Sequence, residues 1–133
     1  MADDLRRILV VDHDDGGRVL MSSILEGAGF ATAGADTGES ALAAARSTLP
    51  RLALVDIYLP GLSGYEVCHR LKMECGDSFP VVLVSRSERE ALDCVAAVLL
   101  EADGCVAKPI RPDDLLHAVH RLLGRPPAAD AAA

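Results

Sequence analysis

The fold is decided by the stretch LALVDIYLPGLSG at residues 52–64. Its first four residues are all apolar, without the polar alternation of a strand that has one face in water. Asp56 ends this run, a Pro-Gly turn follows at residues 60–61, and Gly64 opens a segment with helical spacing. A short continuous apolar run is typical of a strand buried on both faces of a parallel sheet. The stretch therefore predicts a buried strand followed by a crossover helix.

The same unit of strand and helix repeats along the whole chain. Short apolar runs recur at residues 8–11, 30–33, 52–55, 81–84 and 105–107, and the second run is the weakest. The intervals have helical spacing, with helices that end at Gly29, before Pro50 and near residue 75, a fourth that opens at Ser87, and a last one between Pro112 and Gly124. Right-handed crossovers place helices on both faces of one sheet. We therefore expect an α/β fold with a doubly wound five-stranded parallel sheet, (βα)5 and flavodoxin-like, in strand order 2-1-3-4-5.

The length of the chain indicates one domain. Its 133 residues are enough to bury one core, and we assign residues 1–123 to that domain. Residues 124–133, GRPPAADAAA, form a Pro/Ala-rich tail or an interdomain linker. A linker would precede a further output domain, for example one that binds DNA, and the sequence leaves both readings open.

Charge and hydropathy narrow the classes of partner. Twenty acidic residues against thirteen basic ones give a net charge of −7, which is unsuited to binding nucleic acid through this domain. We expect no membrane interaction, because no apolar run approaches the roughly 18 residues of a spanning helix. The N-terminus, MADDLRR, does not resemble a signal peptide. The cysteines at positions 68, 75, 94 and 105 are not clustered, so we expect free thiols in a cytoplasmic protein.

Polar side chains stand where the predicted strands end. They are Asp12-His13-Asp14-Asp15 after the first strand, Asp56 after the third, Ser85 after the fourth and Lys108 after the fifth. Ligands of doubly wound sheets bind beyond the carboxyl ends of the strands, so these groups are expected to meet. Clustered carboxylates suit Mg²⁺, and a hydroxyl and an ammonium can donate to phosphoryl oxygens. The set indicates phosphoryl chemistry, with the central Asp56 as nucleophile.

In this order, the residues resemble the receiver domain of two-component response regulators over about residues 5–123. The most specific piece is VDIYLPGLSG at residues 55–64, and residues 8–12, 84–85 and 108–110 also match. The resemblance implies that Asp56 accepts a phosphoryl group from a histidine kinase or a phosphotransfer protein. The domain would then be a phosphorelay switch that assists its own phosphoryl transfer, and not an enzyme. Switching would change partner binding or the output of the protein.

The resemblance also assigns roles around Asp56. Asp12, Asp56 and the backbone carbonyl of Tyr58 would hold Mg²⁺, while Ser85 and Lys108 would contact the phosphoryl group. The bond from Lys108 to the following proline is often cis in this family, and a cis bond is common only before proline.

One departure from the family pattern concerns the metal. His13 stands where the family usually has a second acid that binds the cation directly. Imidazole is a poorer ligand for Mg²⁺ than a carboxylate. His13 itself, or Asp14 or Asp15 in its place, is therefore a further candidate ligand, and we expect Mg²⁺ binding that is weakened but real.

Three further departures concern access and signalling. Arg86 replaces a small residue, and it can screen the site from small phosphodonors, add charge at the phosphoryl group, or be a solvated loop residue. Cys105 replaces the aromatic residue that usually reports activation. Tyr58 and Ser87 stand where the family tunes water access, and neither is suited to orienting a water, so we expect slow self-dephosphorylation. The apolar residues 95–100 predict a homodimer through the fourth helix, the fifth strand and the fifth helix.

Other functions stay open. His13 and Cys105 favour a degenerate receiver that binds partner proteins without phosphorylation. A haloacid-dehalogenase-like phosphatase would use Asp12 as nucleophile and Asp14 as acid, but Gly16 stands where that motif has Thr or Val. A flavodoxin-like cofactor site is disfavoured, because acidic side chains after the first strand would repel a phosphate.

Overall fold

The computed structural model describes residues 6–86 and 102–124. Its elements, in chain order, are β1 (Arg7–Val11), α1 (Asp15–Gly27), β2 (Ala31–Ala35), α2 (Gly38–Thr48), β3 (Leu52–Asp56), α3 (Gly64–Cys75), β4 (Val81–Ser85), β5 (Gly104–Ala107) and α5 (Pro112–Leu123). The helix expected from Ser87, the apolar residues 95–100 and the tail beyond residue 124 lie outside the described residues. No helix in residues 6–86 or 102–124 has the length and apolarity that a membrane span requires.

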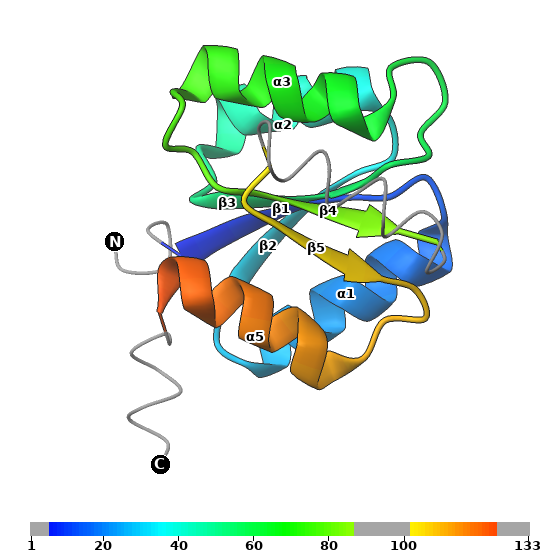
Figure 1. Cartoon of the computed structure of the whole chain (residues 1–133), viewed down its shortest axis with the longest axis vertical. Coiled ribbons are helices and arrows are strands. Elements are labelled where there is room, and N and C mark those ends of the chain that lie inside the picture. Colours follow the sequence, from blue (N-terminus) through cyan, green and yellow to red (C-terminus); the bar gives the residue numbers. More distant parts are fainter. Residues whose placement is uncertain (1–5, 87–101, 125–133) are drawn as a thin grey trace.

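The five strands form one parallel sheet in the order β2-β1-β3-β4-β5, which confirms the predicted topology. Figure 1 shows α2 and α3 on one face of this sheet and α1 and α5 on the other. Alternate residues of the strands serve two separate cores. Leu9 and Val55 pack toward α2 and α3, whereas Ile8 and Leu54 pack toward α1 and α5. Because both faces are covered, every residue of β3 and β4 is buried, as their continuous apolar runs predict.

The weak second run is an edge strand. Among the described residues β2 pairs only with β1, and four of its five residues are exposed or half-buried. The strand begins one residue later than the expected run, because Phe30 packs with the residues around α1 and α5 instead of joining the ladder. An edge strand faces fewer neighbours, so its sequence needs less apolar surface and its bounds are harder to predict.

The helices begin at residues that cap their free N–H groups. Thr37 and Ser40 form a reciprocal capping box at the start of α2, and Ser63 accepts from the Glu66 N–H at the start of α3. Asp14 caps α1 by accepting from the Gly17 N–H at 2.8 Å. These caps set where each chain segment turns from a strand end into a helix.

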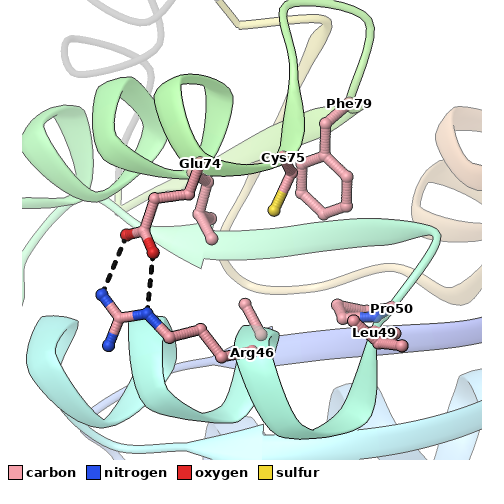
Figure 2. A pocket seen from close by; sticks show the side chains of 8 residues that line it. Arg46, Leu49, Pro50, Glu74, Cys75 and Phe79 are labelled. Carbon is pink, nitrogen blue, oxygen red and sulfur yellow. Dashed lines mark hydrogen bonds and ion pairs between the residues drawn. The ribbon is translucent and has the colours of Figure 1, made fainter.

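A cavity of about 470 Å³ lies between the C-terminal ends of α2 and α3. Figure 2 shows its apolar wall around Phe79 and its rim, where Arg46 of α2 pairs with Glu74 of α3. Burial, followed by the charge of Glu74, raises the pKa of the Cys75 thiol that also lines it, so this thiol is a weak nucleophile at neutral pH. Pro50 and Phe79 precede β3 and β4, so the cavity lies at the edge of the sheet opposite the carboxyl ends of the strands.

A buried lysine anchors the segments that lead into β4 and β5. Lys72 of α3 is 7% exposed, and its ammonium donates to the Phe79 carbonyl at 2.7 Å, to the Asp77 carbonyl at 3.2 Å and to Asp103 at 2.7 Å. The same Asp103 oxygen accepts from the Val81 N–H at 2.9 Å. The network ties α3 to the starts of the two strands whose other ends carry Ser85 and Lys108.

Replacing Lys72 with methionine is expected to destabilise the domain by about 2–4 kcal/mol, because the buried Phe79 carbonyl loses its donor and Asp103 loses its cation. Urea unfolding followed by circular dichroism measures the loss. Arg46→Met is the matched control, because its ion pair with Glu74 lies at the surface, where such pairs contribute little. Equal losses in the two variants would contradict the structural role assigned to Lys72.

Candidate functional site

Three strand ends bring two acids and an ammonium together. Asp12 follows β1, Asp56 ends β3 and Lys108 follows β5. The Lys108 Nζ lies 2.8 Å from Asp12 Oδ2 and 2.9 Å from Asp56 Oδ2, and both carboxylates are 2% exposed. Buried charges are stable only when they are paired or bind a metal, and here one cation serves two anions. The excess negative charge marks this place as one that attracts a further cation.

The charge state of Lys108 follows from its neighbours. Partial burial alone would lower the pKa of its ammonium, but hydrogen bonds and charge attraction from Asp12 and Asp56 outweigh burial and raise the pKa. Lys108 is therefore a permanent cation at physiological pH. Its peptide bond to Pro109 is cis, as the family resemblance implies.

The backbone around Asp56 holds its carboxylate in one orientation. The Tyr58 N–H donates to Asp56 Oδ1 at 2.7 Å, so the two carboxylate oxygens have different partners. The Gly64 N–H donates to the Ile57 carbonyl at 2.9 Å and brings the start of α3 against this loop. A Cβ at Gly64 would lie 2.3 Å from the Asp56 carbonyl oxygen, so only glycine fits there. The sequence indicates Gly64 as a helix start, but it carries no signal for this close approach.

Ser85 places a hydroxyl at the end of the strand next to that of Asp56. It ends β4, next to the strand of Asp56, and the Lys108 N–H donates to its carbonyl at 2.7 Å. The side chain is fully buried, and its Oγ has no hydrogen-bond partner among the described residues. Buried hydroxyls are normally hydrogen-bonded, so an orphaned one at a strand end indicates a binding partner that arrives from outside.

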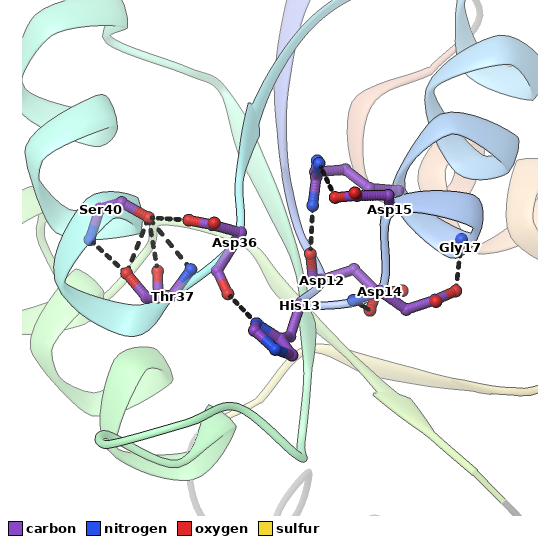
Figure 3. A network of polar contacts seen from close by, with 9 residues as sticks. Asp12, His13, Asp14, Asp15, Gly17, Asp36, Thr37 and Ser40 are labelled. Carbon is purple, nitrogen blue, oxygen red and sulfur yellow. Dashed lines mark hydrogen bonds and ion pairs between the residues drawn. The ribbon is translucent and has the colours of Figure 1, made fainter.

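The side chains that follow Asp12 are not placed as metal ligands beside Asp12 and Asp56. His13 is exposed, and its Nδ1 lies 3.3 Å from the Asp36 carbonyl (Figure 3). The Asp14 carboxylate is used as the cap of α1, while its own N–H donates to Asp12 Oδ1 at 2.9 Å. Asp15 pairs with Arg18. Within residues 6–86 and 102–124, no third histidine, cysteine or acid joins Asp12 and Asp56 in a metal-binding cluster.

Two carboxylates nevertheless suit one kind of ion. Mg²⁺ is usually bound through one or two carboxylates and keeps several waters, so Asp12 and Asp56 fit it without a full protein cage. A buried pair of acids that shares a single ammonium also supplies the negative charge that such an ion neutralises. The donor set is all oxygen, which disfavours soft metals.

Comparison with known proteins identifies the family. The sequence matches the response regulator receiver domain over residues 8–120. The chain belongs to this family. Receiver domains are signalling domains of two-component systems, and response regulators in general work with histidine kinases.

Relatives and solved structures agree with this assignment. The receiver is 37% identical over 120 residues to the DNA-binding response regulator MtrA of Mycolicibacterium smegmatis, covering 90% of this chain and 51% of that protein. It is 33% identical to the transcriptional regulatory protein PhoP of Bacillus subtilis, covering 90% and 49%. The crystal structure of the receiver domain of NtrX from Brucella abortus has a TM-score of 0.80 and 34% identity, covering 87% of this chain and 97% of that one. The chain spans about half the length of the curated relatives it matches.

Within this receiver, the direction of Arg86 is one feature that the sequence left open. The Arg86 guanidinium carbon lies 4.7 Å from the centroid of the Tyr58 ring, a cation–π contact. Tyr58 is 45% exposed, and Arg86 is exposed as well. Ser87, the other residue expected to tune water access, lies outside the described residues.

The expectation of free thiols is wrong for Cys105. Cys68 and Cys75 are free, but Cys105, half-buried on β5, is disulfide-bonded. Its neighbours from α5, among them His117 and Arg121, line a shallow pocket along β5. The cysteines are scattered along the sequence, and their spacing does not predict a disulfide. A disulfide requires two cysteines whose Cα atoms lie close together, and that distance is set by the fold.

Proposed function

We propose that Asp56 is the phosphoacceptor of this receiver and takes its phosphoryl group from a histidine kinase or a phosphotransfer protein. The carrying observation is the placement of the Lys108 ammonium between Asp12 and Asp56, with the orphaned hydroxyl of Ser85 at the end of the neighbouring strand β4. One nucleophilic carboxylate, one cation and one free hydroxyl are the groups that a phosphoryl transfer uses.

The transfer is a simple displacement at phosphorus. A carboxylate oxygen of Asp56 attacks the phosphorus of the donor phosphohistidine, and the bond from phosphorus to the imidazole nitrogen breaks. The electron pair of that bond stays on the nitrogen, and an acyl phosphate forms on Asp56. The Lys108 ammonium and the Ser85 hydroxyl donate to phosphoryl oxygens, so charge that develops there meets donors already in place. The Tyr58 N–H keeps the carboxylate oriented throughout.

The proposal includes a magnesium ion. Asp12, Asp56 and the backbone carbonyl of Tyr58 would hold it, with His13 or Asp14 as a further ligand after a change of side-chain direction. When bound, Mg²⁺ neutralises charge on the phosphoryl oxygens that the two carboxylates would otherwise repel. Because Asp14 is used as a helix cap and His13 contacts Asp36, we expect binding that is weaker than with a second acid in place of His13.

The names of the relatives support a proposal for the role of the whole protein. They are named as DNA-binding and transcriptional regulators and are about twice as long as this chain. We propose that residues 1–123 are the receiver and that residues 124–133 lead toward an output domain. Because bacterial DNA lies in the cytoplasm, such a regulator would act there. A homodimer through β5, α5 and the helix expected between β4 and β5 would carry the signal.

A second function is a receiver that binds partners without phosphorylation. The observation that favours it is that the side chains next to Asp12 have other partners: Figure 3 shows the His13 ring at the Asp36 carbonyl and the Asp14 carboxylate at the Gly17 N–H. A receiver that cannot bind Mg²⁺ would lose phosphoryl transfer but keep its surfaces.

Replacing Asp56 with alanine is expected to abolish phosphorylation. The test is intact mass after incubation with Mg²⁺ and acetyl phosphate, where the wild type should gain one phosphoryl group and the variant none. Beryllofluoride, which mimics the phosphoryl group, should shift the NMR spectrum of the wild type around Ser85 and Lys108. If the wild type gained no phosphoryl group and its NMR spectrum did not change with beryllofluoride, the phosphoacceptor proposal would be wrong. That result would favour the phosphorylation-independent module.

A further inference from the structure

The cavity between the C-terminal ends of α2 and α3 has the size and lining of a small-molecule site. Its volume of about 470 Å³ falls within the roughly 300–1,000 Å³ that is usual for ligand sites in proteins. Its wall is mostly apolar, with Ala45 and Leu49 on the α2 side and Leu71 and Phe79 on the α3 side. Figure 2 shows the Cys75 thiol pointing from the end of α3 into this space. The space therefore suits an apolar group, such as a ring or a short alkyl chain.

The wall of the cavity also exposes apolar surface at a strained residue. Leu49, which follows the last turn of α2, is 73% exposed. Its backbone has φ 49° and ψ 60°, in the left-handed region that residues other than glycine seldom adopt. Strain of this kind is enriched at positions that hold ligands. An apolar ligand that covered Leu49 would remove the side chain from water, which favours binding.

The rim of the cavity supplies hydrogen-bond donors that are not in use. The Nε and Nη2 of Arg46 donate to the two carboxylate oxygens of Glu74 at 2.7 and 3.1 Å. A guanidinium has five N–H groups, so three of them remain. Among the described residues, no other group accepts from these three. A ligand that carries an acceptor can therefore bind Arg46 without breaking its pair with Glu74.

The charge around the rim favours an anionic acceptor. The carbonyls at the C-terminal end of α2 would repel an anion, but the Arg7 Nη1 already donates to the Thr48 carbonyl at 3.2 Å. The exposed Arg51 lies beside Arg7, because its N–H donates to the Arg7 carbonyl at 2.8 Å. Of the described residues that line the cavity, only Glu74 is acidic. Three arginines thus stand against one acid at this end of α2.

We propose that the cavity binds a small carboxylic acid with an apolar body, such as a medium-chain alkanoate. The body lies against Leu49 and Phe79, and the carboxylate accepts from the free N–H groups of Arg46. Binding is reversible and forms no covalent bond. The site lies at the edge of the sheet opposite Asp56, so it is a binding function beyond the proposed role of the phosphoacceptor.

The experiment compares octanoate with 1-octanol, which has the same chain without the charge. Each is titrated into isotope-labelled protein and followed by NMR, with urea unfolding to show that every variant is folded. We expect saturating shifts at the amides around the cavity and tighter binding of octanoate. Arg46→Gln should weaken octanoate binding by about three- to fivefold, the effect of an exposed ion pair, and leave octanol unchanged.

Glu74→Gln is the matched control for the loss of the ion pair. Both it and Arg46→Gln break the same contact between α2 and α3. Glu74→Gln removes a negative charge from the rim and keeps the guanidinium, so octanoate should bind more tightly to it than to the wild type. A purely structural role of the pair would weaken binding in both variants alike, and that result would overturn the proposed role of Arg46.

Filling the cavity tests its place in the fold. Cys75→Phe puts a ring into the space from α3 and should weaken both probes at least tenfold. Met73→Phe is its control, because Met73 is 71% exposed on the same helix and is not among the residues that line the cavity. Equal weakening in the two variants would overturn the site.

Two further results would contradict the proposal. If octanol bound as tightly as octanoate, the carboxylate would add nothing and the proposed class of ligand would be wrong. If the shifts did not saturate, or were spread over the whole surface, binding would be adventitious and the cavity would not be a site. Phosphorylation of Asp56 is measured separately, so its failure would leave this inference standing.

Discussion

Replacing Lys108 with methionine is expected to destabilise the domain by about 3 kcal/mol at pH 8 in the absence of divalent ions. This value is at the lower end of the range for removing one partner of a buried ion pair, because Lys108 is partly exposed. The variant leaves Asp12 and Asp56 buried side by side without a cation. Two like charges that share one buried site repel each other, so the folded variant is less stable where both acids are ionised. Urea unfolding in buffer that contains a chelator measures this loss of stability.

The pH dependence has a definite sign for each protein. In the wild type, Lys108 has a raised pKa, so its stabilisation is fully present below the unfolded pKa of about 10.4 and is lost only at higher pH. In Lys108→Met, the repulsion between Asp12 and Asp56 requires both to be charged, so the destabilisation is expected to be smaller in acid than at pH 8. The variant should therefore be closer to the wild type at pH 4 than at pH 8.

Two controls test the cause of this loss. Adding Asp12→Asn to Lys108→Met removes one of the two like charges and should restore much of the stability. Millimolar Mg²⁺ should also stabilise Lys108→Met more than it stabilises the wild type, because the ion replaces the missing cation. If Lys108→Met were as stable as the wild type at pH 8 in buffer that contains a chelator, Asp12 and Asp56 would need no cation.

Replacing Gly64 with alanine is expected to destabilise the domain by about 4 kcal/mol, in the range of exceptional single substitutions. The new Cβ would lie 2.3 Å from the Asp56 carbonyl oxygen and 2.6 Å from the Ile57 Cα. Both are backbone atoms in a loop held from two sides, so the clash moves the chain that carries the phosphoacceptor. Urea unfolding gives the loss, and the rate of phosphorylation on Asp56 should fall with it.

Gly27→Ala is the matched control for this clash. Gly27 is the last residue of α1, and a Cβ there would meet nothing within 4 Å. The same chemical change is expected to stabilise the domain by roughly 0.4–1 kcal/mol, because alanine restricts the unfolded chain. If both substitutions lowered stability alike, the close approach at Gly64 would not be the reason.

Much of the fold was predictable because its signals are local. The continuous apolar runs at residues 52–55 and 81–84 predicted strands buried on both faces, and β3 and β4 are buried throughout. Pro112 and Gly124 marked the ends of α5, where the structure places them. The strand order followed from crossover handedness and the family resemblance. β2 was less well predicted, because an edge strand needs little apolar surface.

The sequence alone determined which chemical groups stand at the carboxyl ends of the strands, since a residue that follows a buried strand must lie at that edge. The tertiary structure decided their contacts. Lys108 lies 52 residues from Asp56 and 96 from Asp12, yet its one ammonium bonds to both. Arg86 lies over a ring on the neighbouring loop. Such choices depend on distances between segments remote along the chain, which no local pattern encodes.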